Sequence, residues 1–110
     1  MPNVKIFVDE TLLPTCRATL TAALPPLRAT LCASLNVAVP ACQFAVLSVI
    51  AMTDLPRVNV EIHLMPHPDR TRESLTTLAA QVQAQIGAAT ASHTAVRIAT
   101  LNPQTYVALK

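Results

Sequence analysis

Glycine and tryptophan are the residues that this chain most lacks, with one glycine, Gly87, and no tryptophan among 110 residues. A single glycine excludes collagen-like and glycine-rich low-complexity proteins. Charge is also scarce, since 13% of the residues are charged while 52% are apolar. Disordered chains combine low hydrophobicity with high charge, so this composition excludes disorder, and the length predicts one domain over residues 1–110.

The scarcity of charge also limits the partners that the chain can recognise. The formal net charge is only +2, and no cluster of Lys and Arg interleaves with aromatic residues. The sequence therefore predicts no nucleic-acid partner. A small domain cannot bury half of its residues, so much apolar surface must lie outside the core of one subunit. Because large exposed apolar areas mark interfaces, we expect an obligate homo-oligomer.

No segment reads as a targeting signal or a membrane span. The first residues lack a basic region followed by a long apolar one. The most apolar stretch, residues 37–52, is interrupted by Pro40, Gln43 and Ser48. It is also shorter than the roughly 20 residues that a membrane helix needs. We therefore expect a cytoplasmic protein with no membrane partner.

Cysteine occurs an odd number of times, at Cys16, Cys32 and Cys42. No two of these residues have C-x-x-C spacing, which argues against a disulfide framework and against a zinc site. His63 and His67 are four residues apart, but the intervening Met65-Pro66 forbids the continuous helix that a helical metal pair needs. The sequence therefore predicts small buried thiols, no metal and no cofactor.

Hydrophobic periodicity predicts six elements. Apolar side chains recur at helical spacing over residues 14–35 and 72–89, and Thr71 is suited to cap the second helix. Alternating or continuous apolar runs predict strands over residues 3–8, 43–52, 58–64 and 95–101.

Three local features add detail to this pattern. Pro25-Pro26 predicts a kink or a restart in the first helix, because each proline ring removes a backbone hydrogen bond. The apolar residues of strand 43–52 hardly alternate, which is typical of a central strand buried on both faces. Asn102-Pro103 predicts a turn, after which residues 106–109 form a short last strand.

The order strand–helix–strand occurs twice, and a short internal repeat supports it. Shifted by 54 positions, residues 2, 4, 6 and 8 fall on Pro56, Val58, Val60 and Ile62. Two βαβ units, over residues 2–52 and 56–109, predict an α/β (α+β) fold with a four-stranded mixed sheet and both helices on one face. The other face of the sheet is then left bare, and we expect another subunit to cover it.

Pro2 is the first residue that suggests chemistry. Initiator methionine is normally removed before a small residue, which leaves proline with a free secondary amine at the start of a strand. Ordinary α-amino groups titrate around 7.7–8.0, and desolvation disfavours their charged form. In an apolar pocket the Pro2 amine is therefore suited to act as a general base near neutral pH.

The Met1-Pro2 start, the two βαβ halves and the length together resemble the tautomerase superfamily, which has the macrophage migration inhibitory factor-like fold. Within it the chain is most similar to 5-carboxymethyl-2-hydroxymuconate isomerase. The residues that carry this likeness are strand 58–64, the segment Arg-Thr-Arg-Glu-Ser at 70–74, and the tail 106–110. The resemblance implies a homotrimer.

The resemblance also implies roles for individual residues. Pro2 matches the catalytic proline, and Arg70 matches the arginine that holds a substrate carboxylate. Arg72 completes an Arg-x-Arg pair similar to that of malonate semialdehyde decarboxylase. The isomerases place a further arginine where this chain has the uncharged Gln43, which does not match a dicarboxylate substrate. Arg97, on the last long strand, is either a lip of the pocket or an edge-strand gatekeeper.

These features support three functional hypotheses. The first is a tautomerase or isomerase of small unsaturated keto or enol acids, with Pro2 as general acid/base and substrate-binding roles for Arg70, Arg72, Gln43 and Arg97. The second is an enzyme that resembles malonate semialdehyde decarboxylase and decarboxylates or hydrates a three-carbon acid. The third is a non-catalytic trimeric binding protein, which a retained Met1 favours because the nitrogen of Pro2 is then an amide.

Overall fold

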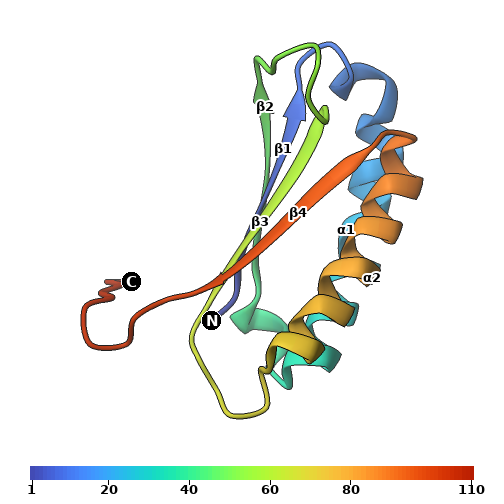
Figure 1. Ribbon diagram of the computed structural model, residues 1–110. Helices are drawn as coiled ribbons and strands as arrows, with labels where there is room; N and C mark the ends of the chain where they lie inside the picture. Colours follow the sequence, from blue (N-terminus) through green and yellow to red (C-terminus); the bar gives the residue numbers. More distant parts are fainter.

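The computed structural model describes residues 1–110 and contains four strands, two long helices and a short 3₁₀ turn (Figure 1). Along the chain the elements are β1 (Asn3–Asp9), α1 (Leu13–Leu35), η1 (Val39–Ala41), β2 (Gln43–Val49), β3 (Val58–Leu64), α2 (Arg72–Thr90) and β4 (Thr94–Thr100).

The four strands form one sheet in the order β2-β1-β3-β4. β1 pairs with β2 in parallel and with β3 in antiparallel orientation, and β3 pairs with β4 in parallel. Each helix connects one of the two parallel pairs, and both helices cover the same face of the sheet (Figure 1). The predicted α+β fold with a mixed four-stranded sheet is therefore confirmed.

The core lies between the two helices and the sheet. The strict alternation of β1 and β3 turns every second residue of each strand toward the helices. The inward residues of these two central strands are fully buried, namely Val4, Ile6, Val8, Val58, Val60, Ile62 and Leu64. Leu78, Val82 and Ile86 of α2 cover them at the predicted helical spacing.

The restart expected at Pro25-Pro26 is wrong, because α1 continues through both prolines as one helix. Both proline rings lie on the exposed side of α1, whereas Leu20, Leu27 and Leu31 are buried. Each proline costs a helix about 3 kcal/mol. Each buried leucine returns roughly 1.5–3 kcal/mol. Packing of the inward side therefore offsets the local cost of the two rings.

The expectation of a central, doubly buried second strand is also wrong. β2 lies at one edge of the sheet, ends at Val49, and has no fully buried residue. Phe44 and Val46 pack against the core under α1, while the alternate residues lie on the face that no helix covers. The chain beyond β2 is exposed, with Ile50 86% accessible. The weak alternation therefore reflects apolar residues on both faces of an edge strand.

The C-terminal segment forms no strand with its own sheet, contrary to expectation. Asn102 accepts backbone hydrogen bonds from Thr105 and Tyr106 and thereby forms the predicted turn. The chain that follows runs away from the layer of helices (Figure 1). Its apolar side chains are uncovered, with Val107 75% and Leu109 93% exposed. Within one subunit, this tail pairs with no strand.

A polar cluster fastens the end of β1 to the β2–β3 connection. The Asp9 carboxylate accepts hydrogen bonds from the Thr11 hydroxyl and, at 3.2 Å, from the backbone N–H of Ala51. Arg57 lies 3.7 Å from the same carboxylate and donates to the Thr11 hydroxyl at 2.9 Å. The hydrogen bond from Thr11, with help from Ala51 and Arg57, lowers the pKa of Asp9 below its ordinary value.

Candidate functional site

Pro2 is buried at the end of the sheet where β1 and β2 begin and β3 and β4 end. Its carbonyl accepts a 3.0 Å hydrogen bond from the backbone N–H of Gln43. The register pairs Asn3 with Gln43 on one side and with His63 on the other. One residue earlier, the same register sets Pro2 between Cys42 and Leu64, which are both buried.

The surroundings of Pro2 are therefore apolar on the helix-covered side. Met1 precedes Pro2 and is 48% exposed, and its sulfur contacts the Nζ of Lys110 from the C-terminal tail. None of the cavities that contain the arginines is lined by Pro2. In this form the nitrogen of Pro2 is a tertiary amide, so a basic role for it requires removal of Met1.

Arg70 stands in the loop before α2, beside the same end of the sheet. Its guanidinium donates to the carbonyl of Met65 at 2.5 Å and to the carbonyl of Leu35 at 3.4 Å. Leu35 is the last residue of α1, so Arg70 binds a carbonyl at a helix end that has no partner within the helix. Arg70 thus ties the β3–α2 loop to α1, and three of its five N–H groups remain available.

The segment after Arg70 begins α2 as predicted. Thr71 has extended backbone angles, and its hydroxyl accepts a 3.1 Å hydrogen bond from the backbone N–H of Ser74. The Ser74 hydroxyl in turn donates to the carbonyl of Asp69 at 3.1 Å. These contacts satisfy groups at the helix start and fix the direction in which Arg72 leaves the first turn.

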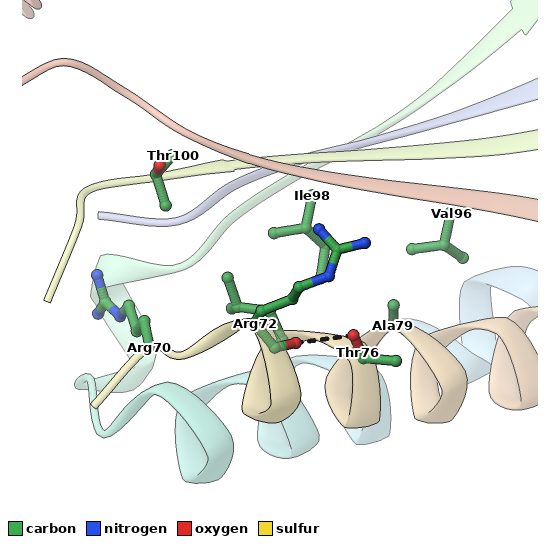
Figure 2. Close-up of a pocket in the computed structure, with 8 residues that line it drawn as sticks. Arg70, Arg72, Thr76, Ala79, Val96, Ile98 and Thr100 are labelled. Atoms are coloured by element: carbon green, nitrogen blue, oxygen red, sulfur yellow. Dashed lines mark hydrogen bonds between the residues drawn. The ribbon is translucent and has the colours of Figure 1, made fainter. Parts of the chain in front are cut away.

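A groove of about 540 Å³ runs between α2 and the edge strand β4. In Figure 2 the Arg72 side chain extends from the first turn of α2 along this groove toward Ile98, whereas Arg70 lies at the end near Thr100. The Arg72 guanidinium has no hydrogen bond or ion pair within the subunit. The lining combines these two cations with small or apolar side chains, which are Leu75, Thr76, Ala79, Val96, Ile98 and Thr100. Such a groove is suited to a small apolar acid.

The register of the sheet relates the groove to Pro2. Thr100, which lines the groove, pairs with Leu64 in the register of β3 and β4. Leu64 is also the residue that the β1–β3 register sets opposite Pro2. Pro2, Leu64 and Thr100 therefore belong to one row across the helix-covered face. The structure thus brings Pro2, Arg70 and Arg72 to one end of the fold.

Gln43 and Arg97 lie away from this groove. Both occupy positions on the sheet face that no helix covers, since their neighbours Phe44, Val96 and Ile98 turn toward the helices. Arg97 donates to the Asn59 side chain at 3.1 Å. Within one subunit, neither residue reaches a ligand in the Arg72 groove.

Sequence reasoning missed the contribution of β4 to the groove. Val96, Ile98 and Thr100 line the groove because they share one side of an edge strand. In the sequence, the charged Arg97 between the apolar Val96 and Ile98 was the signal that these residues face opposite sides of the strand. A second missed feature is the contact between the Cys32 and Cys42 sulfurs, 3.2 Å apart, because the sequence does not show where a helix end meets a strand.

No protein-family model and no curated protein matches the chain. Solved structures do match it over almost its whole length. The macrophage migration inhibitory factor of Toxoplasma gondii aligns with a TM-score of 0.70 at 13% identity, over 96% of this chain and 95% of that one. The asymmetric trimer of wild-type F6 fused 4-OT aligns with a TM-score of 0.74 at 14% identity, over 96% and 91%.

A third similar structure is N1, a member of the cis-3-chloroacrylic acid dehalogenase family. It aligns with a TM-score of 0.70 at 15% identity, over 96% of this chain and 79% of that one. At identities this low, the structural likeness shows the fold alone. The chain therefore has the tautomerase fold that these proteins share, with both of its βαβ units present. Neither of its helices is long and apolar enough to cross a membrane.

Proposed function

We propose that the protein is a cytoplasmic, homotrimeric tautomerase of small unsaturated keto or enol carboxylic acids. The observation that carries this proposal is that Pro2 and the arginine-lined groove lie at the same end of a tautomerase fold. In the proposed reaction the Pro2 amine, freed by removal of Met1, takes a proton from the substrate. It then returns that proton to a different carbon, so no atoms are gained or lost.

The surroundings of Pro2 are chemically suited to this role. Cys42 and Leu64 offer the amine little solvation, and desolvation favours the neutral amine that accepts a proton. The intermediate carries negative charge spread over the enolate and the carboxylate. The Arg72 guanidinium, which has no partner in the subunit, would donate two parallel N–H hydrogen bonds to the carboxylate. Arg70 would add its remaining N–H groups at the Thr100 end of the groove.

A trimer would complete the site. The Arg72 groove lies beside β4, one free edge of the sheet, and β2 at the other edge leaves Leu47 and Val49 only half-buried. The tail, residues 106–110, exposes Val107 and Leu109 and pairs with no strand of its own subunit. If this tail added to the strand edge of a neighbouring subunit, it would cover both the tail and that edge. The similarity to the trimeric F6 fused 4-OT supports this arrangement.

The trimer is tested by sedimentation equilibrium at micromolar concentration. A trimer mass that persists on dilution, with loss of structure when the trimer dissociates, is the expected outcome. A stable, folded monomer under these conditions would show that the exposed apolar edges do not associate.

Within this class the Arg70–Ser74 segment supports an isomerase similar to 5-carboxymethyl-2-hydroxymuconate isomerase. Gln43 lies on the uncovered face and carries no charge, so it adds no further contact for a second carboxylate to the groove of one subunit. We therefore propose a substrate with a single essential carboxylate. The test follows loss of ultraviolet absorbance from phenylenolpyruvate- and hydroxymuconate-type enols, using protein shown by mass spectrometry to lack Met1. Turnover of the acid and no turnover of its methyl ester is the expected pattern.

A second candidate is decarboxylation or hydration of a three-carbon acid. It is favoured by the fact that Arg70 and Arg72 line one groove. N1, which is similar to this chain in fold, belongs to the cis-3-chloroacrylic acid dehalogenase family, which is named for a three-carbon acid. Release of carbon dioxide from malonate semialdehyde, without turnover of enols, would replace the tautomerase proposal by this one. Failure of every acid to react would favour a non-catalytic binding protein. Retention of Met1 would also favour it, because the nitrogen of Pro2 is then an amide.

A further inference from the structure

Two buried thiols meet directly beside Pro2. Cys32 lies in the last turn of α1, and Cys42 immediately precedes β2. Their sulfurs are 3.2 Å apart, and the residues are only 8% and 4% exposed. Cys16, the third free cysteine, is buried elsewhere in α1 and has no sulfur neighbour. The fold thus separates one pair of thiols from one single thiol.

The distance between these sulfurs suits a covalent bond better than a metal ion. Two thiolates on a tetrahedral zinc, each with a bond of about 2.3 Å, stand roughly 3.8 Å apart. The sulfurs here are closer than that, and no third His, Cys, Asp or Glu side chain joins them. A disulfide requires the sulfurs to close to about 2.05 Å. That is a displacement of little more than 1 Å, shared between a helix end and a strand start.

We propose that Cys32 and Cys42 form a redox-sensitive pair that peroxide oxidises to an intramolecular disulfide. The bond would link the end of α1 to the start of β2 across the nine residues that separate the two cysteines, among them η1. This inference does not depend on the proposed tautomerase activity. It concerns a modification site at Cys42, which lies beside Pro2 in the register of the sheet.

The oxidation balances in two steps. One thiolate attacks hydrogen peroxide, the O–O bond breaks, and a sulfenic acid and hydroxide form. The second thiol then attacks the sulfenic sulfur, so an S–S bond forms and water leaves. In total two thiols lose two protons and two electrons, and one peroxide takes them up and becomes two waters.

The environment of the pair makes the reaction slow and selective. Burial and the hydrogen bond with Cys32 raise the pKa of the Cys42 thiol to about 12, although the positive charges of Arg28 and the N-terminus oppose this shift. Little thiolate is therefore present at neutral pH. A small oxidant such as peroxide can enter during local opening. Once a sulfenic acid forms, the neighbouring thiol captures it before further oxidation.

Trypsin separates the pair from the remaining cysteine and so makes a sharp test possible. Cleavage after Lys5, Arg17, Arg28 and Arg57 leaves Cys16 in the peptide of residues 6–17. Cys32 and Cys42 stay together in the peptide of residues 29–57. The full-length native protein is treated with hydrogen peroxide, quenched, alkylated and digested. The masses of both peptides are then measured by mass spectrometry.

We expect the 29–57 peptide to lose two hydrogens and to resist alkylation, while the 6–17 peptide is alkylated normally. Reduction with dithiothreitol should restore both thiols. The matched control Cys16→Ala keeps the pair and should form the same bond. Cys32→Ala should give no loss of two hydrogens in that peptide.

Three results would overturn the proposal. One is sulfinic or sulfonic acid on either cysteine with no disulfide. Another is a bond between Cys16 and either partner in the native protein. The third is the same distribution of disulfides among the three cysteines in urea-unfolded and native protein, which would show that the fold does not select the Cys32–Cys42 pair. The wild-type digest decides the question even if a variant fails to fold.

Discussion

Replacing Arg70 by alanine is expected to lower stability, whereas replacing Arg72 by alanine should lower activity alone. Arg70 donates to the carbonyls of Met65 and Leu35, and the 2.5 Å contact with Met65 is the stronger of the two. A hydrogen bond from a charged group contributes about 1.5–3 kcal/mol. We assign this stabilisation to the contact with Met65, and we expect the longer contact with Leu35 to add little. The Arg72 guanidinium has no hydrogen bond or ion pair in the subunit, so its loss removes no native polar contact.

The expected free energy of unfolding therefore falls by about 1.5–3 kcal/mol in Arg70→Ala and by less than roughly 0.5 kcal/mol in Arg72→Ala. In the proposed tautomerase, Arg72→Ala loses a charge-assisted contact with the substrate. Its kcat/KM for the acid should fall about ten- to hundredfold, with little change for the methyl ester.

The assay combines urea denaturation of both variants with kinetics on the same enol acid and its ester. Arg70→Lys is the matched control, since it keeps the charge and loses the planar fork that reaches two carbonyls. The reasoning is refuted if Arg70→Ala unfolds like the wild type. It is also refuted if Arg72→Ala retains full activity on the acid while Arg70→Ala loses it at unchanged stability.

Two further predictions concern the frame that holds the site. The pKa of Asp9 is lower in the folded state, so its stabilising effect is present above the unfolded value of about 4 and is lost as pH falls through the folded value. Acid titration of stability should therefore be flatter in Asp9→Asn than in the wild type, and identical profiles would contradict this. Ala91 ends α2 in the left-handed region with a φ of 51°, so Ala91→Gly should raise the free energy of unfolding by about 0.5–1 kcal/mol. A loss of stability on calorimetry would show that this backbone is unstrained.

The regular parts of the fold were predictable because their patterns are local. β1 and β3 alternate strictly, and both of their inward rows are buried as expected. Thr71 caps α2 through the short-range contact that its position indicates. These features depend on neighbours a few residues away, which the sequence displays directly.

The errors arose where distant packing decides the outcome. Pro25 and Pro26 sit on the exposed side of a helix whose other side is buried, and the sequence alone does not weigh these two effects. The apolar character of β2 indicated burial but did not distinguish a central strand from an uncovered edge. The structural role of Arg70 was not predictable either, because its bonds to Met65 and Leu35 join three segments that only the folded chain brings together; its role toward a substrate stays a prediction.

The most direct test of the account measures Pro2→Ala against the wild type in the enol absorbance assay, after mass spectrometry has shown Met1 to be absent from both. The account predicts that kcat falls about 10²–10⁴-fold in the variant, with KM changed far less, because a positioned base acts in the transition state. Full activity of Pro2→Ala, or of protein that retains Met1, would contradict the central claim that the Pro2 amine carries the proton.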